Sequence, residues 1–113
     1  MSLAAFLIRF MSSRSAKRFE QATKQPAETQ RDLLMSIIRR NADTEYGRRY
    51  NFALINSIED YQNQVPVISY NDIAEEIARI SGAGEKNVLT SEDPVMFAQT
   101  SGTTGNPKFI PVT

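Results

Sequence analysis

Residues 95–113 of this chain read VMFAQTSGTTGNPKFIPVT. Two apolar runs, Val95–Ala98 and Phe109–Val112, flank a segment of small hydroxyl and glycine residues that ends in a lysine. Apolar runs of this length on either side of a glycine-containing segment predict two β-strands joined by a loop. Because both alternating sides of the first run are apolar, we expect that strand to be buried on both faces.

The loop between these runs has the residue types of an anion-binding site. Gly102 and Gly105 can adopt positive φ angles, which lets backbone N–H groups turn toward one point. Hydroxyl donors and one compact positive charge complete the set: Ser101, Thr103, Thr104 and Lys108. The spacing differs from the P-loop of nucleotide hydrolases, because only two residues separate the glycines and Asn106-Pro107 precedes the lysine. The sequence predicts a phosphate-binding loop, and a polar hairpin turn is the alternative.

Residues 100–108, TSGTTGNPK, match one known motif over nine positions without a gap. They resemble the phosphate-binding motif of the adenylate-forming superfamily, which includes acyl-CoA synthetases, peptide-synthetase adenylation domains and luciferases. The resemblance implies that this loop holds the phosphates of ATP.

The composition limits the chemistry that the chain can perform. Its 113 residues are 41% hydrophobic and 23% charged, as in ordinary folded proteins, and include no cysteine and no histidine. Disulfides, thiol nucleophiles, zinc sites with the usual ligands, and Ser-His or Cys-His catalytic pairs are therefore excluded within this chain. Chemistry here must use carboxylates, hydroxyls, lysine, arginine or the backbone.

Charge is distributed unevenly along the chain. Residues 1–40 contain eight Lys or Arg and three Asp or Glu, whereas residues 41–113 contain five and ten, which gives +5 and −5. The basic part is interpreted as a solvated helical face; nucleic acid or anionic lipid binding is the alternative, without a recognition motif to support it. The apolar run Leu3–Phe10 is interrupted by Arg9 and is far too short to span a bilayer. We expect a cytoplasmic protein that binds neither nucleic acid nor membranes.

Two helices are predicted before residue 42. Gln25-Pro26 breaks the first, and Pro26 suits the first turn of a second helix that ends at about Asn41. The apolar side of the second helix is expected to consist of residues at helical spacing: Leu33, Leu34, Ile37 and Ile38.

Shorter elements are predicted between residues 42 and 94. Gly47 indicates a turn or a short helix, and Ser57 is a candidate N-cap for a helical turn over Ile58–Gln62. The pair Glu75-Glu76 is expected on the solvated face of a further helix, and Asn87–Thr90 is predicted to be β-like. The neighbouring arginines and the tyrosines are assigned to salt bridges and to the edge of the core: Arg48, Arg49, Tyr46, Tyr50, Tyr61 and Tyr70.

Several of these segments occur in a characteristic order. They are residues 41–50 (NADTEYGRRY), 58–67 (IEDYQNQVPV), Tyr70 with Asp72, Arg79-Ile80, and residues 87–90 (NVLT). Together with the loop they resemble the N-terminal region of the auxin-responsive promoter family, called Gretchen Hagen, over about residues 31–113. Members of that family are acyl-acid amido synthetases. The loop departs from the plant pattern, with Thr104 in place of serine and one residue fewer before the lysine, so the substrate is not carried across.

The family resemblance implies a two-step reaction. A carboxylic acid attacks the α-phosphate of ATP, which is accompanied by Mg²⁺, and an amine or amino acid then displaces AMP to form an amide. By the resemblance, the ATP-binding residues are Thr100, Ser101, Gly102, Thr103, Thr104, Gly105 and Lys108, and no catalytic or metal-binding residue is assigned.

The resemblance also predicts the architecture. The parent fold is α/β, and this chain is a mainly α-helical N-terminal part that leads into the first strands of one large adenylate-forming domain. We divide it into two helices (residues 1–41), short helices and extended segments (42–94), and strand, loop and strand (95–113). The chain is shorter than a complete adenylate-forming enzyme, so we expect a fragment without the C-terminal domain, whose partner is the rest of its own domain.

Three functions follow from these observations. The first is a fragment of an amido synthetase that binds ATP weakly or not at all and is inactive alone. A fragment of an acyl-CoA ligase is the second, because it would share the loop. The third is a non-enzymatic helical interaction module in which the loop has no role.

Overall fold

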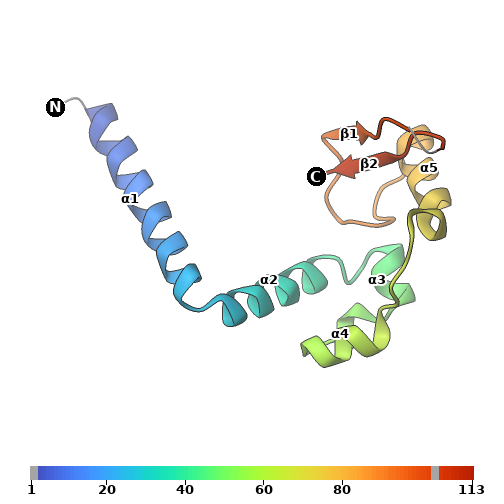
Figure 1. Ribbon diagram of the computed structural model, residues 1–113, viewed down its shortest axis with the longest axis horizontal. Helices are drawn as coiled ribbons and strands as arrows, with labels where there is room; N and C mark the ends of the chain where they lie inside the picture. Colours follow the sequence, from blue (N-terminus) through green and yellow to red (C-terminus); the bar gives the residue numbers. More distant parts are fainter. Residues whose placement is uncertain (1–2, 103–104) are drawn as a thin grey trace. The chain divides into compact units, whose positions relative to one another are not determined.

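The computed structural model describes residues 3–102 and 105–113, with side chains described from Ser13 onward. Thr103 and Thr104 of the predicted phosphate loop lie outside the described residues. The described elements, in chain order, are α1 (Leu3–Lys24), α2 (Pro26–Arg40), α3 (Glu45–Arg49), the 3-10 turn η1 (Phe52–Leu54), α4 (Ile58–Gln64), the 3-10 turn η2 (Tyr70–Ile73), α5 (Ala74–Ala83), β1 (Met96–Gln99) and β2 (Phe109–Val112) (Figure 1). This confirms the prediction of a mainly helical chain that leads into two strands. None of the helices in the part of the chain that the structure describes is long and apolar enough to cross a bilayer.

The chain divides into two units, residues 1–33 and 34–113, and the boundary lies within α2. The first unit contains α1 and the start of α2, separated at Gln25 as predicted. Pro26 is the first residue of α2, where a missing N–H removes no helical hydrogen bond. The Gln25 carbonyl, at the junction of the two helices, accepts hydrogen bonds from the Thr29 N–H (3.0 Å) and the Thr29 hydroxyl (2.9 Å).

The core of the second unit forms where α2 meets the segments that follow it. Its buried members are Met35, Ile38, Phe52 and Ile55, and three tyrosines, Tyr46, Tyr50 and Tyr61, pack against them at the edge as predicted. The predicted apolar side of α2 was partly wrong, because Leu33 and Ile37 are exposed. The helix instead turns Leu34, Met35 and Ile38 toward η1 and α4. Five of the six residues 33–38 are apolar, so their spacing alone does not show which side of the helix is buried.

A glycine allows α3 to approach the end of α2. A Cβ atom at Gly47 would lie 2.0 Å from the carbonyl oxygen of Asn41 and 2.9 Å from that of Ala42. Thr44, buried beside this contact, caps α3: its hydroxyl oxygen accepts from the Gly47 N–H at 2.9 Å. The same hydroxyl donates to the Asn41 carbonyl at 2.8 Å. The junction between α2 and α3 therefore depends on a residue without a side chain.

The segment Asn87–Thr90 is not a β-strand, contrary to the prediction. Its carbonyl groups cap α3 instead: the Glu45 N–H donates to Asn87 (2.8 Å) and the Tyr46 N–H donates to Val88 (2.9 Å). The first N–H groups of a helix have no partner within the helix, so these carbonyls satisfy them. Val88 itself is buried.

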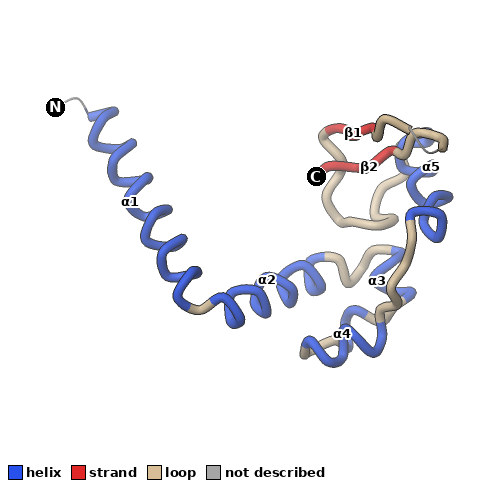
Figure 2. The backbone as a smooth tube through the Cα atoms, in the orientation of Figure 1, coloured by secondary structure: helices blue, strands red, loops and turns tan. Residues whose placement is uncertain are grey.

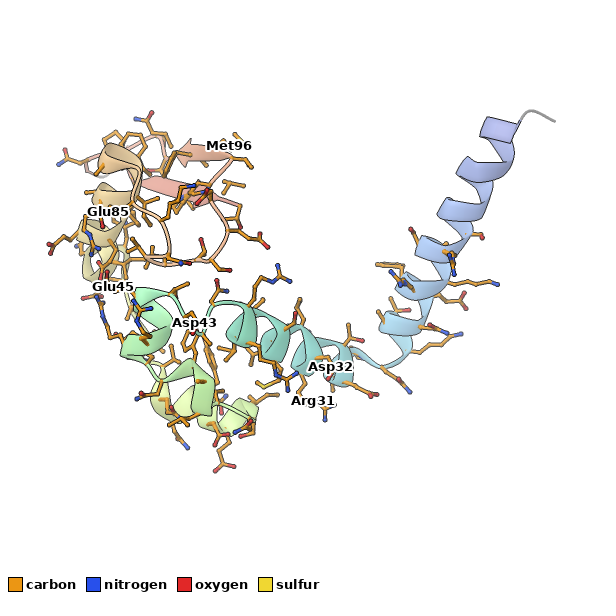
Figure 3. The ribbon with its side chains drawn as sticks, turned by 180° about the vertical axis from the view of Figure 1, so that it is seen from behind. Arg31, Asp32, Asp43, Glu45, Glu85 and Met96 are labelled. Carbon is orange, nitrogen blue, oxygen red and sulfur yellow. The ribbon has the colours of Figure 1, made fainter. Side chains whose placement is uncertain are left out.

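Ion pairs connect α3 with α5. Arg49 contacts Glu76 at 2.7 Å, and Arg79 bridges Glu45 (2.8 Å) and Glu85 (2.7 Å). Glu45 and Glu85 are labelled close to α5 in Figure 3. The predicted salt-bridge role of Arg49 is confirmed, but the prediction that Glu76 lies on a solvated face was wrong, since it is 7% exposed. Hydrogen bonds from Arg79 lower the pKa of Glu45, because they favour the ionised carboxylate.

The two strands form an antiparallel hairpin with Met96 opposite Val112 and Gln99 opposite Phe109. They lie beside α5, which contacts β2 (Figure 1). Ser57 and Ser69, outside the hairpin, cap α4 and η2 through side-chain hydrogen bonds, as predicted for Ser57. The prediction that β1 is buried on both faces was wrong, because Val95 is 80% exposed and Met96 59% exposed. The sheet described by the structure has two strands, and the exposure of Val95 and Met96 shows that side chains of this segment remain uncovered.

The contact at Gly47 predicts a measurable loss of stability. We expect Gly47→Ala to lower the thermal unfolding temperature, because the new methyl group overlaps two backbone carbonyls of the α2 terminus. Overpacking of this kind costs about 1–3 kcal/mol. The matched control is Gly82→Ala in α5, where no atom lies within 4 Å of the added Cβ and alanine favours the helix. Circular dichroism melts that rank the two variants equally would contradict the prediction.

Candidate functional site

The loop between β1 and β2 lines a hollow of about 630 Å³ in the described part of the chain. Figure 2 shows this irregular loop joining the two strands beside α5. The lining residues come from two segments, the loop and the start of η2: Thr100, Ser101, Gly102, Gly105, Asn106, Pro107, Lys108, Tyr70 and Asn71. Small-molecule sites have volumes in this range.

Hydrogen bonds at its base close the loop. The Thr100 N–H donates to the Lys108 carbonyl at 3.0 Å, and the Lys108 N–H donates to the Thr100 hydroxyl oxygen at 3.0 Å. A second turn lies inside, where the Gly105 N–H donates to the Gly102 carbonyl at 3.1 Å. Thr100 and Lys108 therefore sit at the two ends of one closed turn.

Gly102 adopts a conformation that other residues rarely take. Its φ angle is +65°, and a Cβ atom there would lie 2.8 Å from the Gly105 carbonyl oxygen and 3.1 Å from the Pro107 ring. The tight turn thus requires glycine for both its backbone angle and its space. This agrees with the conformational role predicted for Gly102.

Tyr70 reaches the loop from η2. Its hydroxyl oxygen accepts from the Phe109 N–H at 3.2 Å, and its ring centre lies 5.3 Å from the Lys108 ammonium nitrogen. The latter distance is within the range of cation–π contacts. From the sequence, Tyr70 was expected at the edge of the core, and its contact with the loop was not predicted. The sequence feature that could have indicated this role is the occurrence of Tyr70 with Asp72 in the family pattern.

Asp72 fixes the turn that carries Tyr70. Its carboxylate accepts from the Ser69 N–H and the Ser69 hydroxyl, both at 2.7 Å, which forms a capping box. These hydrogen bonds favour the ionised acid and lower the pKa of Asp72. The 3-10 turn therefore presents Tyr70 from a hydrogen-bonded frame.

The charge of the hollow suits an anion. Lys108 is the charged residue in its described lining, and no carboxylate accompanies it. Two smaller hollows in the described chain contain cations that are already paired: Arg40 with Glu92 at 2.7 Å, and Lys86 with Asp93. The described residues bring together no cluster of acidic side chains that could hold a metal ion.

Five of the predicted site residues line this hollow together: Thr100, Ser101, Gly102, Gly105 and Lys108. Thr103 and Thr104 lie outside the described residues. The phosphate-binding role of all seven stays a prediction at this point. Tyr70 and Asn71 also line the hollow, although neither was predicted from the sequence as a site residue.

Comparison with known proteins identifies similar chains. A family model described as the GH3 family N-terminal domain matches residues 15–113. The chain is similar to the probable indole-3-acetic acid-amido synthetase GH3.1 of Arabidopsis thaliana, with 37% identity over 98 residues, 85% of this chain and 17% of the relative. It is also similar to the jasmonoyl-L-amino acid synthetase GH3.5 of Oryza sativa subsp. japonica, with 36% identity over 94 residues, 82% of this chain and 16% of the relative.

A solved structure shares the same fold. It is that of the GH3.15 acyl acid amido synthetase, with a TM-score of 0.76 and 32% sequence identity. The match covers 86% of this chain and 18% of the solved chain. The chain thus spans roughly a sixth of the length of the proteins that it resembles.

The frame around Tyr70 predicts a pH-dependent contribution to stability. Because the folded-state pKa of Asp72 is lowered, its carboxylate stabilises the fold above the unfolded-state pKa of about 3.9. That contribution is lost as the pH falls through the folded-state pKa. We therefore expect Asp72→Ala to lower the unfolding temperature at neutral pH, and the difference from wild type to shrink as the pH falls to about 3.

The control is Glu75→Gln on α5, whose exposed carboxylate makes no hydrogen bond or ion pair in the described part of the chain. It tests whether loss of any surface carboxylate has the same effect. An Asp72→Ala difference that is equally large in acid and at neutral pH would contradict the capping role.

Proposed function

The chain belongs to the GH3 family, matching its N-terminal domain over residues 15–113, and from this membership we propose that its loop binds the phosphates of ATP. The membership confirms the family resemblance drawn from the sequence. One observation supports the proposal most directly: the loop lines a hollow in which Lys108 is unaccompanied by any carboxylate in the described lining. A site of this charge attracts an anion.

The proposed roles divide the loop into shaping and binding residues. Thr100 and Gly102 shape it, through the bonds to Lys108 and through the positive φ angle. We propose that Ser101, Gly102, Thr103, Thr104 and Gly105 hold the phosphates through hydroxyl groups and the backbone N–H groups that the turn leaves free, and that Lys108 offsets the negative charge of the phosphates. Loss of one such preorganised donor typically costs ~10²–10³ in rate.

The proposed reaction is the ATP-dependent joining of a carboxylic acid to an amino acid. The relatives are named for conjugating indole-3-acetic acid and for jasmonoyl-L-amino acid synthesis, which supports an acyl acid and an amino acid as the substrate classes. In the proposed sequence, a carboxylate oxygen attacks the α-phosphorus and pyrophosphate leaves; the amine then attacks the acyl carbon, and AMP leaves. Since the chain spans about a sixth of these relatives, we propose that it acts as the N-terminal part of a longer enzyme.

Mg²⁺ accompanies ATP in this proposal, where it would offset phosphate charge. No described residue is assigned to it, because no acidic cluster that could hold a metal ion occurs among the described residues. Acyl-CoA ligation, the alternative drawn from the loop, receives no support from the relatives named above, which are amido synthetases. No observation favours the helical interaction module.

The binding role can be tested on this chain by NMR titration with Mg²⁺-ATP. We expect the amide signals of Gly102, Gly105 and Lys108 to shift with a dissociation constant of about 1 mM or weaker, since a loop alone contributes little binding energy. Lys108→Ala is expected to weaken the response. Lys86→Ala, which removes an exposed lysine already paired with Asp93, is the matched control. Shifts that bypass the loop, or an equal response in Lys108→Ala, would overturn the proposal.

The reaction class can be tested in the longer enzyme that carries this segment. With ATP, a carboxylic acid and an amino acid, we expect an amide, AMP and pyrophosphate by mass spectrometry. Lys108→Ala is expected to lower kcat/KM by ~10²–10³ while Lys86→Ala leaves it unchanged. A thioester formed with coenzyme A, without amide, would identify an acyl-CoA ligase instead.

A further inference from the structure

We propose that Tyr70 is a positioning residue for the phosphate loop, which holds the Lys108 ammonium at the hollow with its ring and anchors the start of β2 with its hydroxyl. The inference rests on the proposed function, because the position of Lys108 matters only if the loop binds phosphates. It is carried by two contacts from one side chain, the 5.3 Å approach of Lys108 and the 3.2 Å hydrogen bond from Phe109.

The first contact restrains a side chain that has no other partner among the residues that the structure describes. Lys108 is exposed, and a lysine head group on a flexible four-carbon stem samples many rotamers. The face of the Tyr70 ring attracts the ammonium through its quadrupole. The ring carries no net charge, so this attraction leaves the positive charge of Lys108 available to a phosphate. A carboxylate in the same place would cancel it.

The second contact fixes the backbone at the loop exit. The Lys108 carbonyl accepts from the Thr100 N–H, so this pair belongs to the hydrogen-bonded positions of the antiparallel ladder. The next residue along β2, Phe109, therefore directs its N–H away from β1. The Tyr70 hydroxyl accepts from that N–H and holds the residue adjacent to Lys108.

The position of Tyr70 is itself determined. It is the first residue of η2, and the Ser69–Asp72 capping box closes the turn around it. Asn71, the next residue, also lines the hollow. The Tyr70 side chain thus approaches the loop from a segment that is stabilised by its own hydrogen bonds, and it holds the loop exit in place.

Two substitutions separate the two contacts. Tyr70→Phe keeps the ring but removes the hydroxyl, whereas Tyr70→Leu removes both. In the wild-type chain without nucleotide, the ring should shift the Lys108 side-chain methylene protons upfield, and the Phe109 amide should exchange slowly with solvent. We expect Tyr70→Phe to keep the upfield shift and accelerate the Phe109 exchange, and Tyr70→Leu to lose both.

The nucleotide arm repeats the Mg²⁺-ATP titration on the same variants. Loss of an exposed cation–π contact corresponds to a two- to fivefold weaker response, so we expect a change of about that size in Tyr70→Leu. Tyr61→Phe is the matched control, since Tyr61 packs against the core and is not among the described residues that line the hollow. Unchanged amide signals of Ile38 and Phe52 in each variant show that the core remains folded.

The outcomes distinguish this inference from the proposed function. A wild-type Lys108 without an upfield shift, or a shift unchanged in Tyr70→Leu, overturns the positioning role whatever the nucleotide does. If wild type and Tyr70→Leu respond equally to ATP, Tyr70 does not contribute to nucleotide binding, and that part of the proposal is overturned. A wild-type chain with the ring-induced shift but no response to ATP overturns the proposed binding of ATP by this chain alone and leaves the contact itself established.

Discussion

The arrangement of the second unit depends on the absence of a side chain at Gly47. Only hydrogen fits there, because a Cβ would lie 2.0 Å from the Asn41 carbonyl oxygen. This close approach brings the end of α2 to the start of α3, where the Thr44 hydroxyl bonds to both. With α3 in this position, its first N–H groups meet the carbonyls of Asn87 and Val88. One glycine therefore allows α3 to meet both the end of α2 and the segment at Asn87 and Val88, which is distant in sequence.

Ion pairs between α3 and α5 fix the position of α5. Glu76, almost fully buried, contacts Arg49, and a buried carboxylate of this kind is stable only with a partner. Arg79 binds Glu45 of α3 and Glu85 beyond the end of α5, so the middle of α5 is also held. Because η2 leads directly into α5, the turn that carries Tyr70 is held with it. The loop site is thus connected to the core through α5.

Sequence predicted the features that depend on neighbouring residues. The break at Pro26, the cap at Ser57, the two strands and the glycine turn at Gly102 all follow from local preferences. The missed features are contacts between distant residues. Spacing could not decide which side of an apolar-rich α2 meets η1 and α4, nor that Arg49 would meet Glu76. Apolar residues at 87–90 suggested a strand, but their carbonyls cap a helix instead.

In the candidate site, too, some features follow from neighbouring residues and others depend on contacts with distant residues. Local sequence accounts for its backbone, since Gly102 makes the turn and Thr100 closes it. The position of its charge does not follow from local sequence, because free rotation of the lysine stem is worth ~2 kcal/mol of entropy that no described residue of the loop offsets. In the two smaller hollows described above, a carboxylate holds the cation and also neutralises its charge. An aromatic face fixes Lys108 without neutralising it, and that is the property an anion site requires.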